Sequence, residues 1–169
     1  MPILIGGTMT AAFNATEVFE MAIQIERNGS LFYRIAMDKA TTAEARDLLE
    51  KLASMEDDHE RTFIDMRRRL RPELLHDPDD ETLRYLASFV DSEVFDLGKD
   101  PREKLGSLGD LDNILNAAIR AEKDTIAFYT GIRILIDEKL GRDDIDNIIR
   151  EEMLHVAFLR NEIRKLRGK

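Results

Sequence analysis

Apolar residues recur every three or four positions along four long stretches of the chain, which is the spacing of one face of an α-helix. Two of these stretches open on the spacing of a capping box, in Asn14 with Glu17 and in Thr41 with Glu44. The chain is therefore expected to be all-α. The pattern predicts long helices over residues 15–40, 42–70, 110–140 and 142–166.

Short junctions separate the helices of each pair. The Thr41-Thr42 junction is short enough to make the first two helices an antiparallel hairpin, and Arg71-Pro72 ends the second helix. Gly141 suits a C-terminal cap of the third helix, because glycine readily adopts the left-handed conformation that often ends helices. The third and fourth helices are expected to form a second hairpin.

A link of about 40 residues, 71–109, joins the two hairpins. We expect it to contain a helix over 78–95, followed by a glycine-containing loop over 97–109, and to cross the bundle from end to end. The prediction is a single domain over residues 1–169. Its fold would be a four-helix bundle in up-down-down-up order, with a long crossover that contains an extra helix.

The two predicted hairpins are related by an internal repeat. A shift of 96 residues superimposes them without a gap and gives eleven identities over 49 positions, whereas unrelated helices would give about three or four. Duplication is the better explanation. The repeated pairs are Ala22/Ala118, Ile23/Ile119, Glu26/Glu122, Phe32/Phe128, Tyr33/Tyr129, Arg46/Arg142, Asp47/Asp143, Glu56/Glu152, His59/His155, Arg68/Arg164 and Leu70/Leu166.

Acidic residues and histidines recur at positions that should face the bundle core. Glu26 and Glu122 each interrupt a helical stripe of small or apolar residues. Glu56 and His59 share a face with apolar neighbours, because residues three and four apart are adjacent on a helix, and their repeated counterparts do the same. The pattern brings together four carboxylates and two imidazoles, namely Glu26, Glu56, His59, Glu122, Glu152 and His155.

A buried cluster of this kind needs positive charge to be stable. Buried ionised carboxylates cost several kcal/mol each unless they are compensated, and four together repel one another strongly. Two divalent cations cancel four carboxylates. Bridging glutamates could then hold both metals while each imidazole supplies a terminal nitrogen, which leaves room for dioxygen, peroxide or water.

The Glu-x-x-His spacing alone is not specific, since all three histidines of the chain have Glu three residues earlier. Glu73-x-x-His76 lies between two prolines, lacks a regular apolar stripe and has no counterpart 96 residues away, so we assign it to the solvated link. For the repeated pairs the alternative is two surface salt-bridge sites. That alternative would also expose their apolar neighbours.

The composition limits the chemistry further. The 169 residues include no Cys, which excludes disulfides, thiolate zinc sites, iron–sulfur clusters and a cysteine nucleophile. A net charge of −9 without a long basic run disfavours nucleic acid and acidic membrane surfaces. No window holds the roughly 18 apolar residues of a membrane span, and residues 1–13 lack the features of a secretion signal. We expect a cytoplasmic protein with no nucleic-acid or membrane partner.

The six repeated residues resemble the ligand set of ferritin-like di-iron carboxylate proteins. Locally, Ala22-Ile-x-x-Glu26 and Phe32-Tyr33 are most similar to the rubrerythrin-related branch. The resemblance covers both predicted hairpins but not the link. It implies a ferritin-like bundle, a cofactor of two iron ions with manganese or zinc as alternatives, and a homodimer.

The resemblance also implies an oxidoreductase that reduces peroxide or dioxygen, with two departures from rubrerythrins. Rubrerythrins carry a cysteine-rich, rubredoxin-like module that feeds electrons to the site, so this cysteine-free chain would need an external electron donor. They also place an extra Glu where this chain has Thr125. Glu93 in the link could replace that ligand, but exposed helical glutamates are far commoner, so we assign Glu93 to the surface.

Two roles are possible for the side chains of Tyr33 and Tyr129. They could donate hydrogen bonds to the ligand carboxylates, or they could simply pack in the helix core.

Two other functions fit the same residues. The six-ligand set is equally similar to the ferroxidase centre of bacterioferritin, which implies iron oxidation and handling as an alternative. The other alternative is a non-catalytic, metal-stabilised interaction protein whose link binds a partner; a saturated metal site would favour it, because catalysis requires open coordination positions. Manganese with catalase-like turnover also suits a carboxylate-rich site.

Overall fold

The computed structural model describes residues 15–71, 80–89 and 101–168, and the secondary-structure elements in these ranges are all helices. This confirms the all-α class. None of these helices holds an apolar stretch long enough to cross a membrane. The elements are α1 (Ala15–Ala36), the 3-10 helix η1 (Met37–Lys39), α2 (Ala43–Arg69), α3 (Asp80–Ala87), α4 (Pro101–Leu108), α5 (Leu111–Leu135) and α6 (Glu138–Leu166).

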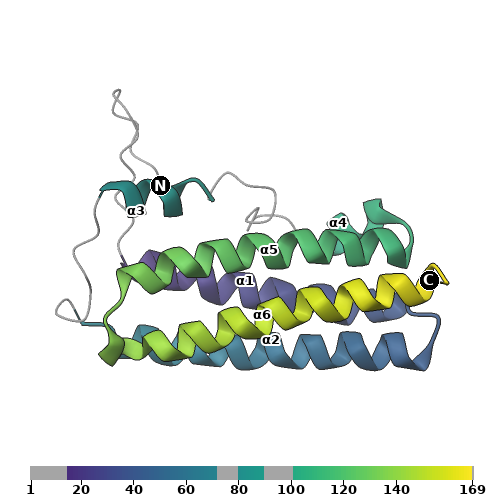
Figure 1. Cartoon of the computed structure of the whole chain (residues 1–169), viewed down its shortest axis with the longest axis horizontal. Coiled ribbons are helices and arrows are strands. Elements are labelled where there is room, and N and C mark those ends of the chain that lie inside the picture. Colours follow the sequence, from purple (N-terminus) through teal and green to yellow (C-terminus); the bar gives the residue numbers. More distant parts are fainter. Residues whose placement is uncertain (1–14, 72–79, 90–100, 169) are drawn as a thin grey trace.

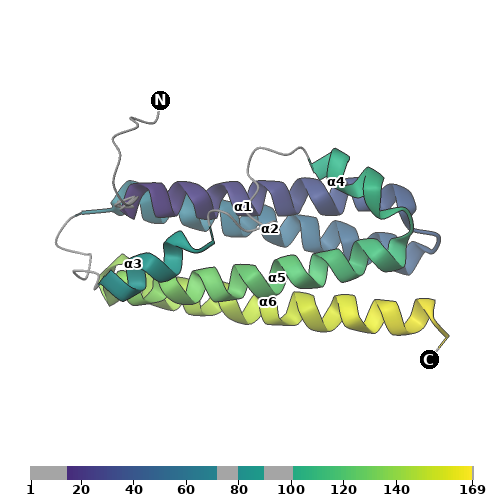
Figure 2. The same cartoon turned by 90° about the horizontal axis from the view of Figure 1, so that it is seen from above.

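The four long helices, α1, α2, α5 and α6, form one bundle (Figures 1 and 2). In Figure 1, α1 and α6 run in one direction along the bundle, and α2 and α5 run in the opposite direction. The helices of each hairpin are therefore antiparallel neighbours. The order is up-down-down-up, as the sequence predicts.

The start of α2 lies one residue later than the capping-box spacing suggests. Thr42, rather than Thr41, is the N-cap, and its side-chain hydroxyl accepts a hydrogen bond from the Ala45 amide at 3.1 Å. This bond satisfies one of the free amides of the first turn. The Asn14 half of the other capping box lies outside the described residues.

The third helix ends earlier than predicted. α5 stops at Leu135, because Ile136 is extended and Asp137 begins a new helix by accepting a hydrogen bond from the Lys139 amide at 2.9 Å. Gly141 does adopt a positive φ of 112°, but it kinks α6 one turn after that start instead of capping α5. The prediction recognised the conformation of Gly141 and assigned it to the wrong helix.

The segment between the hairpins starts at one end of the bundle and finishes at the other. α3 lies beside α5 near the end where α2 finishes, and α4 lies at the opposite end (Figures 1 and 2). Leu86 of α3 is buried, and the Tyr85 hydroxyl donates a hydrogen bond to the Ala127 carbonyl at 2.7 Å. The expected extra helix is thus present at residues 80–87, within the wider predicted range.

The predicted loop over 97–109 is wrong in its second half, because α4 occupies Pro101–Leu108. Proline suits the first position of a helix, where its missing N–H has no helical partner to lose. Leu105 of α4 is buried in the core, and Gly109 has a positive φ of 77° directly after the helix. Glu93 and His76 lie outside the described residues.

Among the residues that the structure describes, the apolar core consists of two clusters. One contains Phe19 of α1 and Phe63 of α2, and the other contains Tyr33 and Leu49 of the same two helices. Along each long helix, the residues of the first cluster and those of the second are separated by the predicted acidic or Glu-x-x-His positions. The bundle interior is therefore apolar at both ends and polar in the middle.

Candidate metal centre

The six predicted side chains meet in the polar middle of the bundle. α1 and α5 each contribute one glutamate, and α2 and α6 each contribute a Glu-x-x-His pair. Their exposed fractions are 5% or less, and those of Glu152 and His155 are 0%. The buried set is Glu26, Glu56, His59, Glu122, Glu152 and His155.

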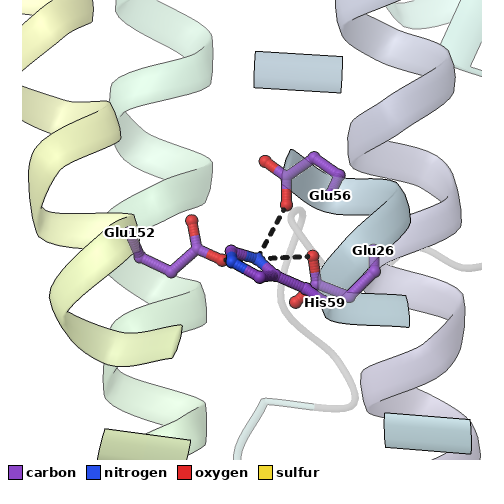
Figure 3. A group of neighbouring side chains, drawn as sticks. All are labelled: Glu26, Glu56, His59 and Glu152. Atoms are coloured by element: carbon purple, nitrogen blue, oxygen red, sulfur yellow. Dashed lines mark ion pairs between the residues drawn. The ribbon is translucent and has the colours of Figure 1, made fainter. Parts of the chain in front are cut away.

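The His59 half of the site is drawn in Figure 3. Nδ1 of His59 lies 3.0 Å from Oε1 of Glu152, and 3.5 Å from Oε2 of both Glu26 and Glu56. One carboxylate comes from α1, one from α2 and one from α6. Three carboxylates and one imidazole nitrogen therefore converge within 4.8 Å of one another, close enough to share a metal ion.

The His155 half repeats this arrangement. Nδ1 of His155 lies 2.8 Å from Oε2 of Glu152, and 3.4 Å from Oε1 of both Glu56 and Glu122. Glu56 and Glu152 belong to both halves, because each places one carboxylate oxygen near His59 and the other near His155. The rings of His59 and His155 are stacked with centroids 5.8 Å apart. The geometry provides two adjacent positions with two shared carboxylates.

Several side-chain atoms of this cluster have no hydrogen-bond partner in the part of the chain that the structure describes and are suited to bind metal ions. Within the described residues, buried atoms that make no hydrogen bond are Nδ1 of His59, both carboxylate oxygens of Glu152 and both ring nitrogens of His155. Buried polar atoms normally have partners, and an unsatisfied one costs about 1–3 kcal/mol. Carboxylate oxygens and imidazole nitrogens are ligands for divalent iron, manganese or zinc. These residues therefore form a metal-binding cluster.

Burial and crowding shift the pKa values of the acids in this cluster. Burial raises the pKa of Glu26 well above its usual range, and the charge of Glu56 adds to the effect. Burial likewise raises the pKa of Glu152 to about 7, with contributions from the charges of Glu122 and Glu26. Both shifts show that the site disfavours the fully ionised carboxylates unless a positive charge accompanies them.

The neighbouring carboxylates raise the pKa values of the two imidazoles. Burial alone would lower the pKa of each, but the surrounding carboxylates outweigh it, and they raise the pKa of His155 to about 12 and that of His59 further. For Glu122, burial acts to raise the pKa, but the nearby imidazole of His155 lowers it below its usual range. These pKa shifts favour protonated imidazoles beside the four carboxylates.

Two tyrosines connect the helices across the site. The Tyr33 hydroxyl of α1 donates a hydrogen bond to Oε1 of Glu122 on α5, and the Tyr129 hydroxyl of α5 donates one to Oε1 of Glu26 on α1. Both tyrosines are buried, and burial followed by the charge of the accepting carboxylate raises their pKa values well above 10. Each hydroxyl therefore remains protonated and orients one carboxylate.

Gly29 and Thr125 are equivalent in the repeat but differ in size. A Cβ on Gly29 would lie 3.4 Å from both Cγ and Cδ of Glu56, so the missing side chain lets Glu56 pack against α1. Thr125, at the position where rubrerythrins have an extra Glu, is buried with an exposed fraction of 5%.

Sequence reasoning missed one contact. Oε2 of Glu151 lies 2.7 Å from Nε2 of His59, on the far side of the ring from the carboxylate cluster. Glu151 directly precedes Glu152, so a search for acids beside the predicted ligands would have included it. Only the packing of α6 against α2 shows which histidine it reaches.

Comparisons with known proteins agree with this arrangement. A family model described as Rubrerythrin matches residues 17–95. Among solved structures, a ferritin-like diiron-carboxylate protein from Thermotoga maritima has the same fold, with a TM-score of 0.63 and 21% sequence identity over 90% of this chain and 95% of that chain. No curated protein sequence matches the chain. The family match over residues 17–95 and the shared fold together support a rubrerythrin-related, ferritin-like family.

Proposed function

We propose that the protein is a dinuclear metal oxidoreductase that reduces hydrogen peroxide or dioxygen with electrons from an external donor. The observation that supports this most directly is the paired geometry of the site, in which each imidazole Nδ1 faces three carboxylates and two carboxylates are common to both halves. Such a set balances two divalent ions in charge. Iron is the metal that we propose, with manganese or zinc as alternatives.

In this proposal each side chain has a defined task. Glu26 and His59 would hold one ion, Glu122 and His155 would hold the other, and Glu56 and Glu152 would be shared between them. A bound pair of ferrous ions would supply two electrons, which with two protons convert hydrogen peroxide into two molecules of water.

The chain's own residues prepare the site for this chemistry. Tyr33 and Tyr129 keep Glu122 and Glu26 oriented through hydrogen bonds. The apolar clusters at either end of the bundle exclude bulk water from the middle, which strengthens the electrostatic interactions inside. Because the chain has no Cys, it holds no thiolate-bound iron to restore the reduced state, and a separate donor must do so.

Metal content is the first test of the proposal. We expect two iron ions per chain in protein isolated from its native host. The double variant Glu56→Ala with Glu152→Ala should lose both, because it removes the two carboxylates that both halves share. Elemental analysis measures this, and full occupancy in that double variant would contradict the site. His76→Ala is the matched control, and its metal content should remain that of the wild type.

Reactivity is the second test. Anaerobically reduced protein should be oxidised rapidly by hydrogen peroxide, as followed by optical absorption, and repeated turnover should require an added donor. Consumption of many Fe²⁺ ions per chain by a large hollow assembly would favour iron handling instead. Tightly held zinc in the native protein, without reaction toward peroxide, would favour a metal-stabilised interaction protein. A size measurement also tests the proposed homodimer.

A further inference from the structure

The two halves of the site differ in how the second nitrogen of each imidazole is held. Nε2 of His59 lies 2.7 Å from Oε2 of Glu151. Nε2 of His155 is buried and makes no hydrogen bond to any residue that the structure describes. Both rings turn Nδ1 toward the carboxylates, so Nε2 is the atom through which the surrounding protein can orient each ring.

The internal repeat accounts for this difference. Shifting the sequence by 96 residues pairs Glu151 with Met55, and each directly precedes the glutamate of its Glu-x-x-His motif. A thioether is only a weak hydrogen-bond acceptor, whereas a carboxylate is a strong one. The proposed ligand residues are therefore identical in the two halves of the repeat. The residue before each Glu-x-x-His motif differs, because His59 has Glu151 as its partner and the equivalent position for His155 is Met55.

A carboxylate behind a ligating histidine has two effects. It fixes the tautomer by accepting the N–H of one ring nitrogen, which leaves the lone pair of the other nitrogen free for the metal, and it makes that nitrogen a better donor. Removing such a partner typically weakens metal binding by about 10–100-fold. Glu151 is partly exposed, with 46% of its side chain accessible, but the imidazole that it contacts is only 3% accessible.

We propose that Glu151 is a positioning residue that makes the two metal positions unequal, so that the position at His59 binds a divalent ion more tightly than the position at His155. This inference rests on the proposed dinuclear site. It predicts stepwise loading, with the first ion held by Glu26, Glu56, His59 and Glu152. Met55 is then the residue that leaves the second position weaker.

Titration of the metal-free protein with Co²⁺ tests this without measuring turnover, because the absorption of bound Co²⁺ reports each binding step. The wild type should bind two ions in steps separated by about tenfold or more. Glu151→Met should weaken the tighter step by about 10–100-fold, so that the two steps merge. Met55→Glu should instead strengthen the weaker step, because it supplies the missing acceptor to His155.

Two controls make the result specific. Glu50→Met replaces an exposed carboxylate on α2 by the same residue and should leave both steps unchanged. The exchange of both residues, Met55→Glu with Glu151→Met, should restore two separated steps. Adding His155→Ala to the exchange should then abolish the tighter step, whereas adding it to the wild type should abolish the weaker one. Circular dichroism of each metal-free variant verifies that the bundle is folded.

Equal affinity of the two steps in the wild type, or an unchanged separation in folded Glu151→Met, would overturn the inference while leaving the dinuclear site intact. Failure of the wild type to bind two ions would instead refute the proposed function on which the inference rests. Loss of both steps in Glu151→Met would also contradict it, because a positioning residue for His59 should not empty the His155 position.

Discussion

The backbone of Gly29 on α1 approaches Glu56 so closely that a Cβ would lie 3.4 Å from Cγ and Cδ of that side chain. Alanine just fits this space and is about 1 kcal/mol better than glycine inside a helix. Gly29→Ala should therefore stabilise the metal-free bundle by up to about 1 kcal/mol in urea denaturation and leave Co²⁺ affinity nearly unchanged. Gly29→Leu should displace Glu56 and lower that affinity by about tenfold or more.

Gly106 provides the matched control for these variants. It also lies in a helix, α4, but a Cβ there would meet nothing within 4 Å. Gly106→Ala and Gly106→Leu should both leave Co²⁺ binding unchanged. Normal affinity in Gly29→Leu would show that Glu56 does not need the space beside α1.

The tyrosine hydroxyls make a second prediction for single residues. Tyr129→Phe removes the hydrogen bond to Glu26, and Tyr33→Phe removes the one to Glu122. A hydrogen bond to a charged group contributes about 1.5–3 kcal/mol, so each variant should bind Co²⁺ at least about tenfold more weakly. Tyr85→Phe, whose hydroxyl bonds to the Ala127 carbonyl away from the cluster, should bind normally. Equal affinity in all three variants would mean that the hydroxyls do not orient the carboxylates.

Among the helices, α3 depends on a glycine of its neighbour α5. A Cβ on Gly131 would lie 2.7 Å from Cδ2 of Leu86 and 3.1 Å from the ring of Tyr85, so a side chain there must displace these two residues of α3. Gly131→Ala should increase hydrogen exchange at the α3 amides while those of α2 stay protected. Unchanged protection of α3 would show that Leu86 can repack around the added methyl group. Gly106→Ala is again the control.

For the whole molecule, the pKa shifts predict how stability depends on pH. Without metal, the folded state raises the pKa of Glu152 from 4.5 to about 7 and that of His155 from 6.5 to about 12, so it keeps protons that the unfolded chain loses. Each such group lowers the free energy of unfolding as the pH rises from its pKa in the unfolded chain to its pKa in the folded state. The decrease is up to about 1.4 kcal/mol per pH unit. The metal-free bundle should therefore become less stable from about pH 5 to pH 9.

Metal should reverse this trend, because its ligands must be deprotonated and protons compete with it. Urea midpoints at pH 5.5, 7 and 8.5, with and without Co²⁺, should show a stabilisation by metal that grows as the pH rises. Glu152→Gln should flatten the metal-free dependence between pH 5 and 7. A metal-free protein that gains stability from pH 5.5 to 8.5 would contradict the assignment of these buried groups.

The sequence alone predicted the parts of this protein that depend on helical periodicity. A stripe that is apolar except for Glu26, or for Glu56 and His59, can only turn those residues inward, because exposing them would expose the apolar residues on the same face as well. The repeat then predicted the same arrangement for the second hairpin. For these reasons the bundle class, the helix order and the convergence of the six side chains followed from local pattern.

Only the tertiary structure decided the features that depend on which surfaces meet. The sequence predicts that Gly141 caps the third helix. In the structure α5 has already ended at Leu135, because Ile136 is extended and buried and Asp137 is the N-cap of α6. The pairing of Glu151 with His59 likewise requires α6 to pack against α2 in one register. Periodicity fixes the direction of a side chain around its own helix, whereas its partner depends on the distance and rotation between two helices, which only the packed bundle determines.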